Sequence, residues 1–595
     1  MDIRTTGGPA TSEEMAAVDS VLGDPTSLWE GGERRAADDH IAFGGLATRS
    51  RRPLLIPVLH AIQDRIGWVS RGALEYACRR LSIPPAEAYG VVSFYGRFAL
   101  EERPALALHV CDDIACKCAG ADELCAALER SVGPAGTTWH RSPCLGLCER
   151  APAALVERAG TMHEELQIAP ITFAVAEGIL AGGVWPTPPT PTLPRRSGGG
   201  GLLRRVGVVD PESIESYREH GGLSALRRAR ELGPEGVIRE LTEARLLGRG
   251  GAAFPTGRKW DSVSKAPMRP HYLVCNADES EPGTFKDREL LERDPFAVVE
   301  AMAIAAFATG CEKGYLYVRG EYPLARRRIE NAIALASAEG SLDLEIEVRR
   351  GAWAYICGEE TALFNSIEGK RGEPRNKPPF PVHAGLFGKP TLVNNVETLV
   401  NVLDIMSEGG AAFAATGTAE STGTRLFCLS GHVSKPGLYE VPMGTTLRAL
   451  IEVAGGVRDG RAVQAVLLGG AAGSFVTEPQ LDVPLSFEGT RAIGATLGSG
   501  AVIVFDETAN LKQILLRIAR FFRDESCGQC VPCRVGTKRQ EEILERMLNE
   551  RNGDRQADVL LLSDIARALR DASICGLGQT AATAIASGLT QLKVI

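Results

Sequence analysis

The sequence predicts a multidomain protein in which mixed α/β domains are combined with helical ones. Its 595 residues exceed what a single hydrophobic core organises. A stretch rich in proline and glycine, residues 183–205, separates two large parts of the chain. In the second part, short apolar runs of strand character alternate with longer runs of helical spacing, which is typical of an α/β layered domain.

Composition and charge exclude several classes of protein. A content of 44% hydrophobic and 24% charged residues is ordinary for a globular chain. The net charge of −8, without a long basic run, argues against nucleic acid as a partner. No uninterrupted apolar stretch is as long as a membrane span, and residues 1–50 lack the apolar core of a signal peptide. We therefore expect a cytoplasmic protein without direct membrane insertion.

The first hundred residues predict an extension followed by helices. Residues 1–50 have weak hydrophobic periodicity and many charges, so we expect a mobile or loosely packed extension. Residues 51–104 have a helical pattern, with a break at 67–70 and a second helix at 73–81. Apolar residues mark one face of the first helix: Leu54, Leu55, Val58, Ile62 and Ile66. Taken alone, this segment is a plain helical bundle.

Six of the fifteen cysteines lie within residues 105–182, and four of them form a first cysteine group: Cys111, Cys116, Cys144 and Cys148. Disulfides are rare in the cytoplasm, so clustered cysteines suggest metal or redox chemistry. A strand-like run at 105–110 leads to Cys111, a helix is expected at 121–130, and a strand at 153–156. Two loops that each deliver two thiolates suit a 2Fe–2S cluster. Zinc, which prefers C-x2-C pairs, and a thiol redox pair are the alternatives, and Cys118 is easily confused with Cys116.

A second cysteine group lies in the helical region 508–595: Cys527, Cys530, Cys533 and Cys575. Three closely spaced cysteines and a remote fourth can supply one thiolate to each iron of a 4Fe–4S cluster. Zinc is again the alternative. An apolar stripe precedes the group and predicts a core-facing helix: Leu511, Ile514, Leu515, Ile518, Phe521 and Phe522. The seven cysteines outside both groups are expected to be small core residues.

The linker and a small strand-rich region frame the central part of the chain. Five prolines and then four consecutive glycines within 183–205 cannot build a packed core, so we expect a linker that is stiff at first and flexible after. Residues 424–507 contain four strand-like runs around one helix at 446–454. We interpret this region as a structural spacer.

The chain is organised around a glycine-rich loop at 248–257 and the lysine that follows it, Lys259. Residues 248–260 read GRGGAAFPTGRKW, and glycines let backbone amides approach a phosphate, to which a lysine adds a point charge. Residues 276–288 add carboxylates and amides that can hold hydroxyl groups. The pattern Gly248-x-Gly250-x-x-Ala253 fits a Rossmann fingerprint, but we reject that interpretation because residues 237–247 have helical rather than strand character. An ordinary surface loop is the other alternative.

These two stretches, with residues 351–381 and 391–398 (TLVNNVET), resemble the flavin- and NADH-binding motifs of the NADH-oxidising subunit of respiratory complex I. That subunit recurs in NAD-linked hydrogenases and formate dehydrogenases, and the resemblance covers residue 236 to the end. The first cysteine group and the sequence CLGLCERAP resemble the thioredoxin-like 2Fe–2S subunit of complex I, over about residues 51–180. The chain therefore looks like a fusion of two subunits. The implied domains are a thioredoxin-like 2Fe–2S domain at 105–182, an FMN- and NADH-binding α/β domain at 206–423, a β-grasp-like domain at 424–507 and a 4Fe–4S helical bundle at 508–595.

The resemblance also implies the residues of the site. The FMN contacts would be Gly248, Arg249, Gly250, Lys259, Asn276, Asp278, Glu279, Ser280, Tyr355, Gly358, Glu359, Val393, Asn394, Asn395 and Thr398. NAD(H) would lie near Phe254, Glu281, Glu360, Lys377 and Phe380. Two positions depart from the family, since Ala253 replaces a glycine and Ser262 replaces an aromatic residue near NADH. Glu281 would repel the 2′-phosphate of NADPH, so NADH is favoured.

The flavin subunit of this family works with another catalytic subunit. Hydride would pass between nicotinamide and FMN, and single electrons between FMN and the clusters. The fused plan, with both cysteine groups intact and the end of the chain 20 residues after Cys575, resembles the β subunit of NAD-dependent molybdenum or tungsten formate dehydrogenases. We expect a higher-order heteromer whose partner carries the molybdenum or tungsten cofactor and further clusters. The alternatives are the diaphorase subunit of a soluble NAD-reducing nickel–iron hydrogenase and a fused complex I subunit.

Overall fold

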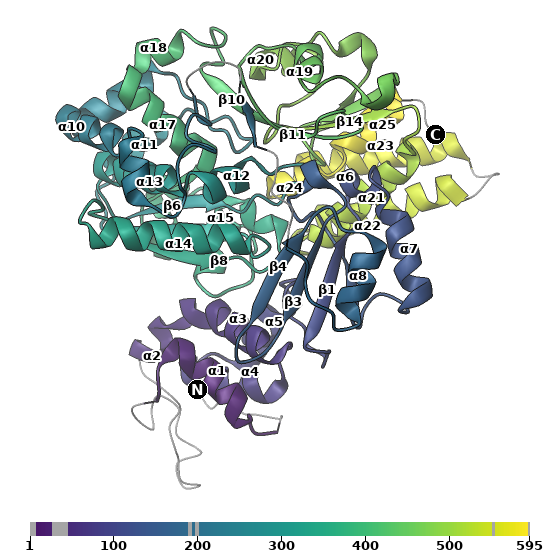
Figure 1. Ribbon diagram of the computed structural model, residues 1–595, viewed down its shortest axis with the longest axis horizontal. Coiled ribbons are helices and arrows are strands. Elements are labelled where there is room, and N and C mark those ends of the chain that lie inside the picture. Colours follow the sequence, from purple (N-terminus) through teal and green to yellow (C-terminus); the bar gives the residue numbers. More distant parts are fainter. Residues whose placement is uncertain (1–7, 26–45, 188–192, 197–200, 550–553, 593–595) are drawn as a thin grey trace.

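The computed structural model describes residues 8–25, 46–187, 193–196, 201–549 and 554–592 (Figure 1). The chain passes through N-terminal helices, a small sheet, a central parallel sheet with its helices, a six-stranded sheet and C-terminal helices. In Figure 1 the N-terminal helices lie at the bottom, and the C-terminal helices lie behind and beside the small sheet. None of the helices within the described ranges combines the length and apolar character that a membrane span needs.

The N-terminal region is a cluster of helices: α1 (Ser12–Leu22), α2 (Leu46–Ser50), α3 (Leu55–Ile66), α4 (Arg71–Leu81) and α5 (Pro85–Val92). The predicted helices α3 and α4 are confirmed. The expectation of loose packing is wrong for α1, which begins with a capping box of Thr11 and Glu14 and buries Val18 completely against α3 and α4. Its short apolar face, three residues in eleven, gave little periodic signal. The other parts of the expected extension, 1–7 and 26–45, lie outside the described residues.

The small sheet has the order β2-β1-β3-β4 and carries the first cysteine group. Its elements are β1 (Leu106–Cys111), α6 (Ile114–Lys117), α7 (Ala121–Ser131), β2 (Trp139–Ser142), β3 (Ala154–Arg158), β4 (Glu164–Ile168) and α8 (Phe173–Leu180). Only β1 and β2 run parallel, and α7 and α8 cover β1 with a core that includes Leu128 and Trp139. The predicted strands β1 and β3 and the helix α7 are confirmed. The strand β4, EELQI, is too charged to be recognised from apolar alternation.

The predicted linker is partly structured. Residues 195–196 form β5 (Arg195–Arg196), which adds to the edge of the six-stranded sheet beside β11 (Gly437–Pro442). Leu202 and Leu203 are buried, and their backbone amides donate to the Glu440 carboxylate at 2.9 and 3.0 Å. The expectation that the whole of 183–205 cannot pack is therefore wrong, because its last residues satisfy a buried acid. Residues 188–192 and 197–200 lie outside the described ranges.

The central domain is an α/β layer built on a parallel sheet with the order β8-β7-β6-β9. Its strands are β6 (His271–Ala277), β7 (Cys311–Val318), β8 (Glu345–Arg350) and β9 (Thr391–Asn395). Its helices are α9 (Ile214–Glu219), α10 (Ser224–Glu243), α11 (Thr256–Ser264), α12 (Lys286–Arg293), α13 (Pro295–Thr309), α14 (Pro323–Ala338), α15 (Glu360–Ile367), α16 (Pro381–Ala384), α17 (Val396–Glu408) and α18 (Gly410–Ala414). The apolar helix α13 is buried against β6 and β7. The predicted alternation of strands and helices is confirmed.

The six-stranded sheet has the order β13-β12-β14-β10-β11-β5. Beyond β5 and β11 its elements are β10 (Thr424–Gly431), α19 (Leu447–Val453), β12 (Val463–Leu468), β13 (Ser474–Val476), α20 (Phe487–Ala492) and β14 (Ala501–Asp506). The four predicted strands and the one predicted helix are present, and β13 and α20 are additional. The chain then forms the C-terminal helices α21 (Leu511–Glu525), α22 (Val531–Asn549), α23 (Arg555–Ala572), α24 (Gly576–Thr580) and α25 (Thr583–Gln591). The apolar stripe on α21 is buried, as predicted.

Candidate functional site

The carboxyl ends of the parallel strands gather the expected site residues at one edge of the central sheet. β6 and β9 are neighbours in parallel register, with Asn276 opposite Asn395. β7 leads into Arg319, and β8 leads into the loop that contains a 3₁₀ turn at Tyr355–Gly358. In open α/β sheets, ligands bind beyond the carboxyl ends of the strands. Blocks that are far apart in sequence therefore converge on one candidate site.

The glycine-rich loop lies against the beginning of α17. The Gly248 amide donates to the Phe254 carbonyl at 3.0 Å, and the Arg249 amide donates to the Thr398 hydroxyl at 2.8 Å. A Cβ atom added at Gly250 would stand only 3.1 Å from the Asn395 Cβ, so the close approach requires glycine. The loop follows the helix α10 instead of a buried strand. The rejection of a Rossmann fingerprint is thus confirmed.

Lys259 connects α11 to the neighbouring strand β9. Its Nζ donates to the Val393 carbonyl at 2.9 Å, and the indole of Trp260 donates to Asn394 Oδ1 at 3.0 Å. Burial lowers the pKa of Lys259. The ammonium also lies 5.7 Å from the centre of the half-exposed Phe254 ring. A partly buried cation thus lies beside the glycine-rich loop, where an anionic group would be stabilised.

Asn276 and Asp278 lie at the carboxyl end of β6 and directly after it. The Asn276 amide donates to the Gly358 carbonyl at 2.9 Å, which ties β6 to the Tyr355–Gly358 turn. One Asp278 carboxylate oxygen accepts from Ser280 at 3.3 Å, while the other, Oδ2, is buried without a hydrogen-bond partner among the described residues. Burial raises the pKa of Asp278 well above its usual value. A buried oxygen that lacks a partner fits a ligand that donates a hydrogen bond there.

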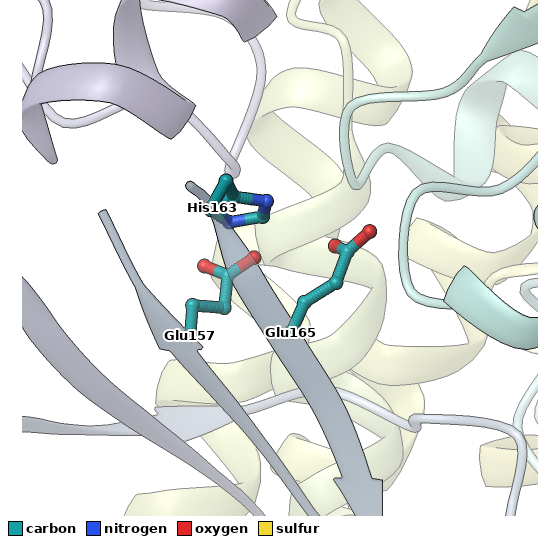
Figure 2. Close-up of side chains that lie close together, drawn as sticks. All are labelled: Glu157, His163 and Glu165. Carbon is teal, nitrogen blue, oxygen red and sulfur yellow. The ribbon is translucent and has the colours of Figure 1, made fainter. Parts of the chain in front are cut away.

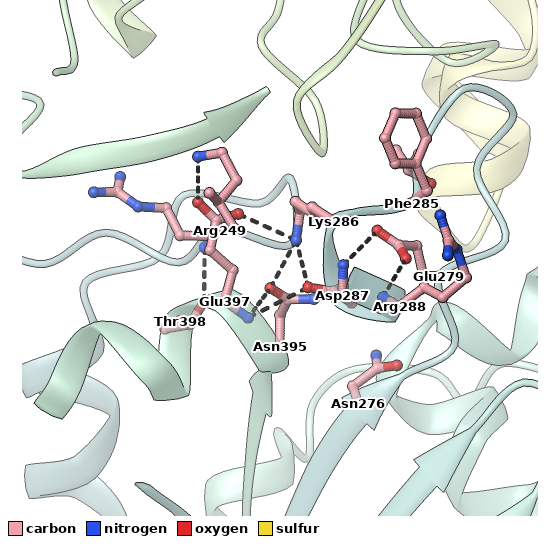
Figure 3. Close-up of polar contacts among 12 residues, drawn as sticks. Arg249, Asn276, Glu279, Phe285, Lys286, Asp287, Arg288, Asn395, Glu397 and Thr398 are labelled. Carbon is pink, nitrogen blue, oxygen red and sulfur yellow. Dashed lines mark hydrogen bonds and ion pairs between the residues drawn. The ribbon is translucent and has the colours of Figure 1, made fainter. Parts of the chain in front are cut away.

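Other expected contact residues have side chains that bind the protein itself. The Arg249 guanidinium donates to the Thr422 carbonyl at 2.7 Å. Glu279 accepts from the Asp287 and Arg288 amides at 3.0 Å each, as Figure 3 shows. Glu359 caps α15 by accepting from the Thr361 amide at 2.8 Å. For these three residues, the side chains therefore hold the loops around the site in place.

The residues expected near NAD(H) border the same edge. Glu281 accepts from the Tyr355 hydroxyl at 2.5 Å and from the Ala472 amide at 2.8 Å, and burial raises its pKa to about 7. The Lys377 ammonium bridges the Glu359 and Glu360 carboxylates at 2.9 and 2.7 Å. Two large aromatic side chains, Phe254 and Phe380, are 45% and 52% exposed and flank the neighbouring helices α11 and α16. Such rings offer flat faces to a planar ligand.

The first cysteine group is buried between the small sheet and the central domain. The sulfurs of Cys144 and Cys148 are 3.3 Å apart. Hydrogen bonds from the Cys111 and Cys148 thiols hold the pKa of Cys144 well below its usual value, so these side chains face one another. Cys118 differs, since its carbonyl contacts His432 at 3.3 Å and burial raises its thiol pKa to about 12.

The second cysteine group surrounds the start of α22 and the start of α24. Burial, together with the neighbouring thiols of the other three cysteines, raises the pKa of Cys533 to about 12. Cys533 and Cys575 are buried, whereas Cys527 and Cys530 are partly exposed. A Cβ atom added at Gly578 would lie 3.1 Å from the Cys533 Cβ. The segment that carries Cys575 therefore packs closely against the segment that carries the other three cysteines.

Comparison with known proteins places these regions in families. Residues 241–404 match the Nuo51 FMN-binding domain, 46–176 the thioredoxin-like [2Fe-2S] ferredoxin, 426–471 the SLBB domain, and 513–593 the NADH-ubiquinone oxidoreductase-F iron–sulfur binding region. The F 2 subunit of NADH-quinone oxidoreductase of Rhizobium meliloti (strain 1021) is 45% identical over 403 residues, which are 66% of this chain and 95% of that protein. The chain belongs to the family of NADH-quinone oxidoreductase F subunits.

The relationship to these F subunits extends to a hydrogenase and to a solved structure. The NADP-reducing hydrogenase subunit HndC of Solidesulfovibrio fructosivorans is 44% identical over 387 residues, which cover 63% of this chain and 78% of that protein. A chain of the air-oxidised NAD+-reducing [NiFe]-hydrogenase superposes with a TM-score of 0.80 and 34% identity, over 92% of this chain and 94% of that chain. The thioredoxin-like domain and the flavoprotein part therefore occur together in a known structure.

Membership of this family supplies the cofactors. The chain has an FMN-binding domain, a thioredoxin-like [2Fe–2S] domain and a 4Fe–4S binding region, with NADH as substrate. The geometry fits each group. The partnerless Asp278 oxygen and the Gly250 approach suit FMN, and the mutually facing thiols of each cysteine group suit a cluster. The predicted cofactors and fold class are thus confirmed.

The sequence did not predict a buried charge network that joins the starts of α12 and α17 (Figure 3). Lys286 Nζ contacts Asp287 Oδ1 at 2.7 Å, Glu397 Oε2 at 3.1 Å and Asn395 Oδ1 at 3.1 Å. Asn395 also donates to Asp287 Oδ2 at 2.6 Å. These residues lie inside the motif stretches 276–288 and 391–398, which can be recognised in the sequence. Nothing in the sequence indicated that their charges pair with one another.

A second cluster, of Glu157, His163 and Glu165, has the spacing of a metal site (Figure 2). Arginines already pair with its carboxylates, since Arg97 and Arg350 contact Glu157 and Glu165, respectively. Arg326 lies 2.9 Å from the other Glu165 oxygen. We therefore interpret it as an ion-pair network that joins the N-terminal helices, the small sheet and the central domain.

Proposed function

We propose that the chain is the NADH-oxidising, diaphorase subunit of an NAD+-dependent formate dehydrogenase. The four stretches that resemble flavin- and NADH-binding motifs (248–260, 276–288, 351–381 and 391–398) converge at the carboxyl edge of the central sheet. This convergence supports the proposed FMN contacts. In this proposal the amides of the glycine-rich loop and the Lys259 ammonium would hold the FMN phosphate, and Asn276 and Asp278 would hydrogen-bond the rest of the cofactor. The full contact set is the one expected from the motifs: Gly248, Arg249, Gly250, Lys259, Asn276, Asp278, Glu279, Ser280, Tyr355, Gly358, Glu359, Val393, Asn394, Asn395 and Thr398.

NAD(H) is proposed to bind over the same edge between the exposed rings of Phe254 and Phe380. Glu281 and the Glu360–Lys377 pair hold its polar groups. FMN, when bound, supplies the conversion between two-electron hydride chemistry and one-electron transfer to the clusters. The chain's residues hold the two rings in contact and limit the access of water. The Glu281 carboxylate disfavours a 2′-phosphate, so we propose NADH over NADPH.

The cluster ligands are proposed to be the two cysteine groups. Cys111, Cys116, Cys144 and Cys148 bind the 2Fe–2S cluster, and Cys527, Cys530, Cys533 and Cys575 bind the 4Fe–4S cluster. The mutual approach of the thiols supports both sets. We further propose that the protein is cytoplasmic, within a higher-order heteromer whose partner carries molybdenum or tungsten and additional clusters.

The fused thioredoxin-like and flavoprotein plan supports the formate assignment, because it resembles the β subunit of such enzymes, although NAD-reducing hydrogenases share that plan. One observation favours a second candidate, a diaphorase subunit of an NAD-reducing hydrogenase: the near full-length superposition on the [NiFe]-hydrogenase chain. A fused complex I subunit is the third candidate, supported by the NADH-quinone oxidoreductase relatives.

Side-by-side assays on the native complex distinguish the candidates. The complex is purified from its host with partners attached, and FMN and iron are measured first. Formate-dependent NAD+ reduction without hydrogen activity supports the leading assignment. Hydrogen-dependent reduction alone moves the chain to the hydrogenases. If the complex oxidises NADH with a dye but reduces NAD+ with neither formate nor hydrogen, only the diaphorase function is retained. If NADH oxidation fails even with the dye and the protein contains no flavin, the proposed site is refuted.

A further inference from the structure

We propose that Arg319 is a positioning residue that joins the loop of Cys144, here the ligand loop, to the loop of Glu279, here the flavin loop. We also propose that its charge raises the reduction potential of the 2Fe–2S cluster. The inference rests on the proposed ligand role of Cys144. Arg319 directly follows β7, at the carboxyl edge of the central sheet. Its side chain is only 2% exposed.

Two of the three side-chain hydrogen bonds of Arg319 join loops that belong to different domains. NH1 donates to the Glu279 carbonyl at 2.7 Å, in the loop expected to contact FMN. NH2 donates to the Cys144 carbonyl at 2.7 Å and to Glu321 Oε1 at 2.6 Å. A planar guanidinium can reach two carbonyl groups at once from a fixed position, which a lysine ammonium does less well. Arg319 thus sets the distance between the two loops.

Arg319 is paired with fewer carboxylates than the neighbouring buried arginine, and this difference underlies its proposed effect on the cluster potential. A second buried arginine that contacts the same ligand loop, Arg288 of α12, donates to the Gly146 carbonyl at 2.9 Å but pairs with three carboxylates: Glu149, Glu289 and Glu292. Arg319 has one carboxylate in salt-bridge contact, Glu321. The second Glu321 oxygen is buried without a partner among the described residues. Arg319 and Glu321 therefore act on the cluster as a close pair of opposite charges, with the cation hydrogen-bonded to the ligand backbone.

The sign of the effect follows from the electron count. Reduction of a 2Fe–2S cluster adds one electron and therefore one negative charge. A buried cation beside a ligand favours the reduced form, and a buried anion disfavours it, with little screening by water. Removing the Arg319 charge should lower the potential, and removing the Glu321 charge should raise it. Opposite shifts from neighbouring residues would not arise from a merely structural defect.

Redox titration followed by electron paramagnetic resonance tests the proposal. The full-length protein, purified with its partners, is compared as wild type, Arg319→Gln, Arg319→Lys and Glu321→Gln. We expect a lower 2Fe–2S midpoint potential in Arg319→Gln, a smaller decrease in Arg319→Lys, and a higher potential in Glu321→Gln. Arg158→Gln, which removes a surface arginine of the small sheet, 42% exposed, should leave the potential unchanged.

Each outcome decides the question. Equal potentials in wild type, Arg319→Gln and Glu321→Gln, or shifts of the same sign, would overturn the proposal. If Arg319→Gln fails to assemble the cluster, the Glu321→Gln shift alone decides it. A wild-type protein without a 2Fe–2S signal would instead refute the proposed ligand set, which is a separate failure.

Discussion

The backbone amide of Ala472 donates a hydrogen bond of 2.8 Å to Glu281 Oε1. Ala472 lies in the loop between β12 and β13 of the six-stranded sheet, and Glu281 follows β6 of the central sheet. The same loop contains Gly470, where an added Cβ atom would meet Glu281 Cγ at 2.6 Å. The sequence alone suggests that residues 424–507 form a structural spacer. This contact gives it a second role, since it fixes an acid of the proposed NAD(H) site.

Substitution of Gly470 by alanine should impair NADH binding. The added methyl group would displace Glu281, and the positive φ of +79° adds backbone strain. We expect KM for NADH to rise about tenfold, equivalent to about 1.4 kcal/mol, with FMN content unchanged. Gly460→Ala is the matched control, because Gly460 has a φ of +66° but open space around its Cβ position. Equal KM values in the two variants would contradict the predicted role of the loop.

NADH oxidation should depend on pH through Glu281. Burial raises the pKa of this carboxyl from 4.5 to about 7, against the opposing hydrogen bonds from Tyr355 and Ala472. Because the folded pKa exceeds the unfolded one, its contribution to stability is complete below about pH 4.5 and is lost as pH rises through about 7. The ionised form accepts stronger hydrogen bonds, so KM for NADH should rise as pH falls through 7.

The pH profile of Glu281→Gln checks this origin. The variant cannot ionise at this position. Its KM for NADH should therefore vary little across roughly one pH unit on either side of the wild-type Glu281 pKa of about 7. Steady-state kinetics with a dye acceptor give KM at each pH. An unchanged inflection in Glu281→Gln would assign the titration to a different group.

Lys259→Met should weaken FMN binding. The partly buried ammonium lies beside the glycine-rich loop and donates to the Val393 carbonyl at 2.9 Å, so its loss removes both a cation and this hydrogen bond. We expect FMN affinity to fall by about 10- to 100-fold, since hydrogen bonds to charged groups contribute about 1.5–3 kcal/mol. Fluorescence titration of the flavin-depleted protein measures it. Lys265→Met, on the same helix but 73% exposed, serves as the control and should bind FMN normally.

Two neighbouring cysteines offer a direct test of the first cysteine group. Cys116→Ser should abolish the 2Fe–2S signal in electron paramagnetic resonance and lower the iron content by two atoms per chain, because each iron of the cluster needs two sulfur ligands. Cys118→Ser should retain both, since the Cys118 thiol lies outside the mutually facing group. Loss of the signal in Cys118→Ser alone would exchange the two assignments.

Sequence patterns predicted the parts of this molecule whose chemistry is local. The glycine-rich loop and the apolar stripe of α21 each depend on residues near one another in the chain, and each is found where expected. Contacts between distant segments were not predictable. Arg319 and Cys144 are 175 positions apart, and Glu440 meets the end of the linker across 238 positions. The helix α1 was missed for a different reason, because its apolar face is short.

The packing of Tyr322 against Gly146 provides the last prediction. Gly146 lies between Cys144 and Cys148, two of the proposed cluster ligands, and a Cβ atom added there would stand 2.1 Å from the Tyr322 hydroxyl oxygen. Tyr322 is fully buried and lies 3.2 Å from Glu279 Oε2, so it cannot move aside without disturbing the flavin loop. Gly146→Ala should therefore loosen the thioredoxin-like domain from the central domain. We expect a lower Tm and faster cleavage of the 183–205 segment in limited proteolysis, with a destabilisation of about 1–3 kcal/mol.

A matched glycine separates this packing effect from backbone strain. Gly136, in the same small domain, also has a positive φ, +122°, but nothing within 4 Å of its Cβ position. Gly136→Ala should thus show only the strain, while Gly146→Ala should show strain and the clash with Tyr322. The double variant Gly146→Ala/Tyr322→Ala, which removes the ring from the path of the new methyl group, should recover the cleavage resistance of Tyr322→Ala alone. If Gly146→Ala and Gly136→Ala were equally resistant to cleavage, the two domains would be held together by contacts other than this one, and the buried arginines Arg319 and Arg288 would be the next residues to test.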